Sequence, residues 1–84
     1  MSRIFPLDDS IQVVANGDNV PLSFFWLEQN HVVIDVINQW RTKKNWFHDP
    51  VYRDYFFVAT NTRAVATIFY DYIKLGWYFQ RLYG

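Results

Sequence analysis

The sequence predicts a small all-β domain of about six mostly antiparallel strands, rolled into a partly open barrel. Three observations favour this fold class. Apolar and polar residues alternate with a period of two along most of the chain, which is the spacing of strands with one buried face. Turn-forming residues recur between these short segments, as in a meandering sheet. The 84 residues also include 8 Phe, 6 Tyr and 4 Trp, and aromatic residues favour strands.

The first three strands are expected at residues 11–15, 21–27 and 32–40. Asn16-Gly17 ends the first strand, because both residues tolerate the positive φ of a tight turn. Pro21 suits the first position of the second strand, where the ladder needs no N–H donor. A turn at Gln29-Asn30 leads into the third strand, which is rich in β-branched residues.

An exposed loop is expected at residues 42–50, because this segment is polar and basic and ends in Asp49-Pro50, which disfavours helix. The last three strands are expected at residues 54–60, 64–71 and 77–83. Asn61-Thr62 and Lys74-Leu75-Gly76 form the turns between them. Closing such a meander into a barrel removes open edges that would otherwise invite aggregation.

The length indicates one domain over residues 1–84, in which residues 1–10 form an N-terminal extension. The sequence contains no Cys, so disulfides and thiolate zinc sites are excluded and a reducing compartment is favoured. It shows no secretory signal and no apolar run near the ~20 residues that cross a bilayer. We therefore expect a cytoplasmic protein with no membrane partner.

The apolar content exceeds what one shallow core can hold. The chain has 38 large apolar residues, counting Phe, Tyr, Trp, Val, Ile and Leu. Six strands of ~5–6 residues, with half of their positions inward, offer roughly 18 core positions. This excess favours a second small core, a homodimer contact or a ligand-binding face.

The net charge is zero, but its distribution is uneven. Residues 1–40 carry one basic and five acidic side chains, a charge of −4, whereas residues 41–84 carry seven basic and three acidic, a charge of +4. Such asymmetry can mark a face that binds polyanions. The alternative is that the two halves interleave in one domain, so that their fields cancel.

Residues suited to catalysis or metal binding are sparse. Ser10 and Ser23 have no neighbouring His or glycine-rich elbow, and His31 and His48 lie far apart in the sequence. Asp8-Asp9 fits a polar turn better than a pair of catalytic carboxylates, and three glycines make no phosphate-binding loop. We therefore expect no enzyme, no metal and no cofactor.

The segment 40–48 is the best candidate for a binding site, because cations and aromatic residues interleave along it. Single-stranded nucleic acid is held in this way, with cations along the phosphates and bases stacked on rings. The candidate residues for binding a nucleic acid or a protein partner are Arg41, Lys43, Lys44, Trp46, Phe47 and Arg53. The alternative interpretation is a solvated loop whose Trp46 and Phe47 plug one end of the barrel.

Several charges have a second possible use. Arg53 and Arg81 extend the basic surface or pair with carboxylates, those of Asp35, Asp54 or Asp71. Asp35 interrupts an apolar strand, and an inward carboxylate there would need a basic partner such as Arg41 or Arg81.

The four tryptophans are expected to differ in their roles. Trp46 lies in the polar loop and is expected to be at least partly exposed beside the two lysines. The other three lie in alternating strands and are expected to be mainly structural, namely Trp26, Trp40 and Trp77.

Strand-borne motifs resemble an uncharacterised family of small bacterial all-β proteins. The matching segments are Pro21-x-x-Phe24-x-Trp26, Ile37-x-x-Trp40-Arg41, Arg53-x-Tyr55-Phe56-x-Val58, Tyr70-Asp71 and Trp77-x-Phe79-x-Arg81-x-Tyr83. They cover about residues 20–83, and the sequence departs from the family in having no glycine in the turn at 61–63.

Some members of that family lie beside, or are fused to, a Y-family polymerase-like subunit of bacterial translesion synthesis. The resemblance therefore implies an accessory role in bacterial DNA metabolism. We expect a non-catalytic interaction module that binds single-stranded nucleic acid through its basic aromatic loop. The alternative is a protein–protein or homodimerisation module with no nucleic-acid contact.

Overall fold

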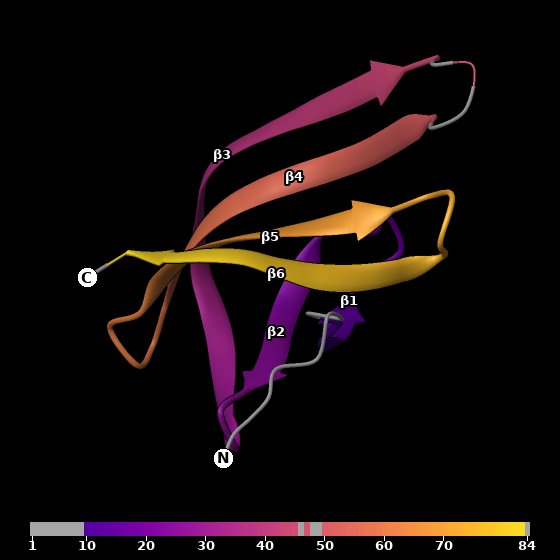
Figure 1. Ribbon diagram of the computed structural model, residues 1–84. Coiled ribbons are helices and arrows are strands. Elements are labelled where there is room, and N and C mark those ends of the chain that lie inside the picture. Colours follow the sequence, from indigo (N-terminus) through magenta and orange to yellow (C-terminus); the bar gives the residue numbers. More distant parts are fainter. Residues whose placement is uncertain (1–9, 46, 48–49, 84) are drawn as a thin grey trace.

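The structure, a computed structural model, describes residues 10–45, 47 and 50–83. All regular structure in this part of the chain is strand: β1 Gln12–Ala15, β2 Pro21–Trp26, β3 Gln29–Lys44, β4 Val51–Thr60, β5 Val65–Asp71 and β6 Gly76–Tyr83. Each strand pairs antiparallel with the next, in the order β1-β2-β3-β4-β5-β6 (Figure 1). The prediction of six antiparallel strands in a curled, partly open barrel is confirmed. The predicted N-terminal extension lies outside the described residues, apart from Ser10.

The long strand β3 joins two parts of the sheet. It pairs with β2 over its first residues and with β4 over the remainder. Its register with β4 shifts between Val33 and Asp35 and again between Val36 and Asn38. Such irregularities bend a strand and increase its twist, so β3 turns from one part of the sheet into the other (Figure 1). β1 and β2 consequently lie across the concave side of β3–β6.

One edge of the sheet is brought back toward the other. The backbone N–H of Ile11 donates to the carbonyl oxygen of Trp77 at 3.0 Å, and Ser10 forms an antiparallel bridge with Tyr78. The start of β1 therefore contacts the start of β6. The far half of β3 has β4 on one side and no described strand on the other.

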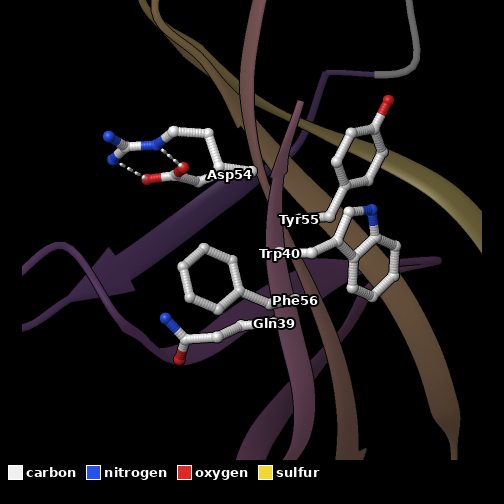
Figure 2. Close-up of a pocket in the computed structure, with 6 residues that line it drawn as sticks. Gln39, Trp40, Asp54, Tyr55 and Phe56 are labelled. Carbon is white, nitrogen blue, oxygen red and sulfur yellow. Dashed lines mark hydrogen bonds and ion pairs between the residues drawn. The ribbon is translucent and has the colours of Figure 1, made fainter. Parts of the chain in front are cut away.

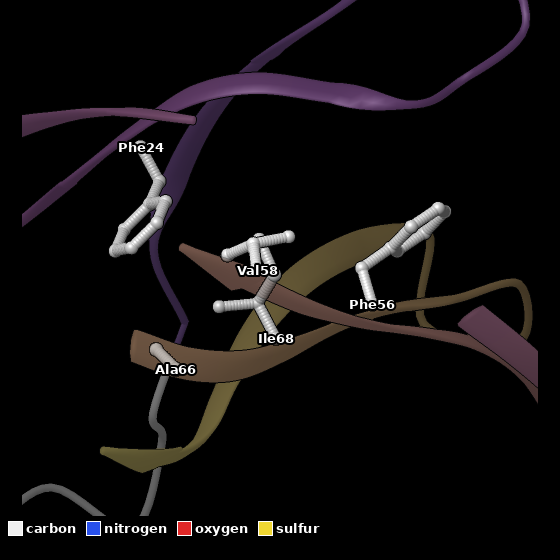
Figure 3. Packing of buried hydrophobic residues seen from close by; sticks show 5 residues of the cluster. All are labelled: Phe24, Phe56, Val58, Ala66 and Ile68. Atoms are coloured by element: carbon white, nitrogen blue, oxygen red, sulfur yellow. The ribbon is translucent and has the colours of Figure 1, made fainter. Parts of the chain in front are cut away.

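The core lies on the concave side. Alternation places Phe56 and Val58 of β4 on this side, and the register sets them opposite Ile68 and Ala66 of β5. Phe24 of β2 completes the buried cluster from across the sheet (Figure 3). Partly buried side chains surround it, namely Ile11, Val13, Val20, Trp26, Val33, Val36, Trp77 and Phe79. The aromatic alternation seen in the sequence thus builds the core.

The turn between β2 and β3 lies two residues earlier than predicted. Leu27 and Glu28 form it with φ of 53° and 59°, while Gln29 and Asn30 already belong to β3. Tight hairpin turns with positive φ at two central residues favour Asn and Gly, because other side chains are strained there. A turn made by Leu and Glu carries neither signal, which is why the sequence pattern misplaced it.

Candidate functional site

The predicted basic loop is shorter than expected. β3 continues to Lys44 and β4 begins at Val51, so the expectation of a loop over 42–50 is wrong for residues 42–44, and residues 45–50 connect the two strands. We call the paired residues 40–44 and 51–55 the β3–β4 arm. The arm extends away from β1 and β2 (Figure 1). Its polar residues tolerate strand geometry because they pair across strands on an open edge, where charged side chains also discourage aggregation.

The regular register along the arm assigns its side chains to two faces. Trp40, Thr42 and Lys44 stand opposite Tyr55, Arg53 and Val51, and these pairs share one face. Arg41 and Lys43 stand opposite Asp54 and Tyr52 on the other face, which is the side of the core. The four predicted basic residues of the arm are therefore brought together but divided, two to each face.

On the core side, Arg41 is engaged by Asp54. Its Nε and Nη2 donate to the two carboxylate oxygens of Asp54 at 2.6 and 3.0 Å (Figure 2). The hydroxyl of Tyr72 donates to the same carboxylate at 2.8 Å. The hydrogen bond from Arg41 holds the pKa of Asp54 below its ordinary value, and the hydrogen bond from Tyr72 acts in the same direction. Desolvation acts to raise this pKa but is outweighed. Lys43 lies over the ring of Tyr52, with its Nζ 5.3 Å from the ring centroid.

The opposite face carries an aromatic stack that crosses four strands, which we call the ring ladder. Its rings are Trp40, Tyr55, Phe69 and Tyr78, one each from β3, β4, β5 and β6. Successive ring centroids are 5.3, 5.0 and 5.5 Å apart. The Trp40 and Tyr55 rings are nearly parallel, with an interplanar angle of 2° (Figure 2). Cross-strand aromatic pairs of this kind stabilise a sheet.

Arg53 reinforces the ladder from the same face. It donates to Asp71 at 3.1 Å and to the Tyr55 hydroxyl at 3.2 Å, and its guanidinium lies 4.6 Å from the Phe69 ring centroid. Arg53 therefore pairs with Asp71, which is one of the two uses that the sequence indicated for this residue. Arg53 thus has a structural role on this face. Lys44 lies on the same face and makes no ion pair with a described residue.

Trp40 does not occupy the position expected of it. The sequence predicted a mainly structural tryptophan, yet Trp40 lies on the face opposite the core and is 42% exposed. The irregular register of β3 between Val36 and Asn38 changes which residues turn inward, so simple alternation fails to place Trp40. Trp26 and Trp77 do pack against the core as expected. Asp35 is exposed and so needs no buried basic partner.

An open hollow of about 340 Å³ lies on the arm (Figure 2). It is lined by Gln39, Trp40, Arg41, Asp54, Tyr55 and Phe56. Phe47, in the connection between the two strands, is 95% exposed. Trp46, the remaining predicted site residue, lies outside the described residues.

A second hollow, of about 300 Å³, lies near the other end of the sheet and is bordered by His31. His31 is buried, and its ring stacks on Phe24 at a centroid distance of 5.1 Å. Its Nδ1 lies 2.6 Å from the Thr62 hydroxyl oxygen, and its Nε2 lies 3.3 Å from the Trp26 carbonyl oxygen. Both ring nitrogens therefore have protein partners, and we assign His31 a structural role.

Within residues 10–45, 47 and 50–83, no group of three or more His, Asp or Glu side chains is placed to hold a metal ion. No helix long and apolar enough to cross a membrane occurs in the part of the chain that the structure describes.

Sequence reasoning found the basic residues of the arm but missed the ring ladder. The alternation of Arg53, Tyr55 and Phe57 indicates that these side chains share a face, which is the available signal. The partners of Tyr55 on β3 and β5 follow only from the strand register, which short motifs do not contain.

A family model described as a domain of unknown function (DUF6504) matches residues 2–77. The chain belongs to the DUF6504 family. This match agrees with the resemblance to an uncharacterised family. No curated protein and no solved structure matches the chain.

Proposed function

We propose that this DUF6504 domain is a non-catalytic module that binds single-stranded nucleic acid on the β3–β4 arm. The observation that carries the proposal is the interleaving of basic and aromatic side chains on one projecting pair of strands. Arg41, Lys43, Lys44 and Arg53 lie among Trp40, Tyr52 and Tyr55. The non-catalytic part rests on the sequence, which offers no nucleophile with an adjacent base.

Rings and cations on one surface suit a single strand because its bases are free to stack while its phosphates attract positive charge. The charge on the arm is only partly available. Arg41 and Arg53 already pair with Asp54 and Asp71, whereas Lys43 and Lys44 make no ion pair with a described residue. We therefore expect modest affinity and a modest salt dependence.

The salt dependence is the first test. Each phosphate neutralised on a single strand contributes a slope of about −0.7 to a plot of log affinity against log salt. Two lysines predict a slope of about −1.4, and all four cations about −2.8. Fluorescence anisotropy of a labelled oligothymidylate, titrated with the protein at several salt concentrations, measures this slope.

The matched variants are a Lys43→Gln/Lys44→Gln pair on the arm and Arg63→Gln in the turn after β4, at the far end of that strand. The double lysine variant should bind less tightly with a shallower salt slope, and the Arg63 variant should behave as wild type. Absence of oligonucleotide binding at low salt, or equal effects of the two changes, would contradict the proposal.

A protein contact is the second candidate, because apolar side chains are exposed on the outer face of β1–β3. Val14, Phe25, Val32 and Ile34 are all exposed there, and Ser23 between them pairs with Val14 on one side and Val32 on the other. A homodimer or a partner protein could cover this surface. Association through it would hardly respond to salt, because it is driven by apolar burial. Sedimentation velocity at low and high salt separates this candidate from the first.

The cellular setting follows from the family resemblance noted in the sequence. Members beside a polymerase-like subunit of bacterial translesion synthesis support an accessory role in bacterial DNA metabolism, where single strands are exposed. Such a setting suits a small module that holds a strand without altering it. A gene neighbourhood shared with repair polymerases would support this role, and an unrelated neighbourhood would count against it.

A further inference from the structure

We infer that one nucleobase stacks on the free side of the Trp40 ring and that Lys44 holds a neighbouring phosphate, so the bound strand lies on the ring-ladder face of the arm. This inference rests on the proposed function and adds to it a face, a stacking position and a phosphate contact. The main observation behind the inference is that the ring ladder ends at Trp40.

A ring inside a stack has both sides occupied, whereas a terminal ring has one side available. Tyr55 lies between Trp40 and Phe69 and is 8% exposed, although it is on the face opposite the core. Trp40 has Tyr55 on one side only, and β3 has no described strand beyond it at this point. An incoming planar ring would therefore extend the ladder by one member.

The other end of the ladder is occupied. The Tyr78 ring has Phe69 on one side, and the Nζ of Lys74 lies 5.4 Å from its centroid. The backbone at Tyr78 is also bridged to Ser10. Within the described residues, Trp40 is therefore the ladder position that offers a ring surface to a ligand.

Strand geometry distinguishes the two lysines. Lys44 is four residues beyond Trp40 on the same face, about 13 Å along the strand. Lys43 is on the opposite face, where its Nζ lies over Tyr52. A strand with a base on Trp40 can place its backbone beside Lys44 while staying on one face, whereas contact with Lys43 would require it to cross the edge of β3. The combination of an open ring and a same-face cation favours nucleic acid over the aromatic side chain of a protein.

The adjacent lysines provide the decisive comparison. Anisotropy titrations with labelled oligothymidylate should show that Lys44→Gln weakens binding several-fold and makes the salt slope shallower by about 0.7. Lys43→Gln should change the dissociation constant by less than about twofold. Both substitutions remove the same charge from neighbouring positions, so a difference between them reports the face on which the strand lies.

Trp40 is tested in the same assay. Trp40→Leu should weaken binding by about tenfold, within the range for one lost stacking contact. Trp40→Phe keeps a planar ring and should lose less than about threefold. Phe25→Leu removes a half-exposed ring from β2, far from the arm, and should have no effect. Thermal unfolding of each variant identifies any loss of binding that comes from loss of the fold. If Trp40→Leu fails to fold, the comparison of Trp40→Phe with wild type still tests the stacking.

The outcomes separate the inference from the function it deepens. Failure of the wild-type protein to bind the oligonucleotide overturns both. Binding by wild type with Lys43→Gln at least as damaging as Lys44→Gln, or with Trp40→Leu equal to Phe25→Leu, overturns this inference and leaves the proposed function standing. Loss on Trp40→Leu without any dependence on Lys44 or salt would rule out the phosphate contact at Lys44 and would also overturn it.

Discussion

Phe24→Ala should lower the free energy of unfolding by about 3–5 kcal/mol, because it empties a filled position in a small core. Phe24 is 2% exposed and faces Phe56, Val58, Ala66 and Ile68 from across the sheet (Figure 3). Small domains have about 5–15 kcal/mol of stability in total, so this one change removes a large share. Urea or thermal unfolding followed by tryptophan fluorescence measures the effect.

The neighbouring residue supplies the control. Phe25 has the same side chain on the same strand, but it points to the other face and is 46% exposed. Phe25→Ala should cost less than about 1 kcal/mol, as substitutions outside a packed core usually do. Equal losses at both positions would contradict the assignment of the concave side as the core.

Asp71→Ala should be the second strongly destabilising change, at about 3–5 kcal/mol, because it leaves the partly buried Arg53 without its carboxylate. Asp71 is buried, and its Oδ1 accepts hydrogen bonds from the backbone N–H groups of Ile73 and Lys74, each at 2.9 Å. It therefore holds the turn before β6 as well as the ion pair. Asp71→Asn keeps an acceptor for the turn but loses the charge, so it should fall between wild type and Asp71→Ala.

The same carboxylate makes stability depend on pH. Desolvation acts to raise the pKa of Asp71, but the hydrogen bonds from the Lys74 N–H, Arg53 and the Ile73 N–H outweigh it and hold the pKa below its ordinary value. A carboxylate of this kind stabilises the fold above its unfolded pKa of about 3.9 and stops doing so as the pH falls through its folded pKa. The difference in stability between wild type and Asp71→Ala should therefore shrink below about pH 4. A difference that stayed constant down to pH 2 would show that the charge contributes nothing.

Much of the fold could be predicted because burial in this domain follows local alternation. β4 alternates between buried and less buried positions over residues 56–60, and β4 and β5 were both expected within three residues of their actual ends. The turn at Leu27 and Glu28 could not be predicted, because its positive φ values are imposed by pairing between β2 and β3 and not by Asn or Gly. Tertiary context there overrides local preference.

The sequence predicted the basic residues of the candidate site but not its strand geometry or its ring ladder, for a similar reason. Lys43 and Lys44 read as loop residues because their strand geometry depends on partners in β4. The ring ladder depends on three registers at once, those of β3 with β4, β4 with β5 and β5 with β6. The short turn at 61–63 makes the pairing of Tyr55 with Phe69 simple to infer, but the irregular register of β3 hides the pairing of Tyr55 with Trp40.

The central claim is that single-stranded nucleic acid binds the β3–β4 arm. Backbone amide chemical shifts of the isotope-labelled protein, recorded during titration with an oligothymidylate, test it most directly. We predict that the chemical shifts of residues 39–44 and 51–55 change during the titration. The chemical shifts of Val14, Phe25 and Val32, on the outer face of β1–β3, should not change. Changes confined to that outer face, or no changes at low salt, would contradict the claim.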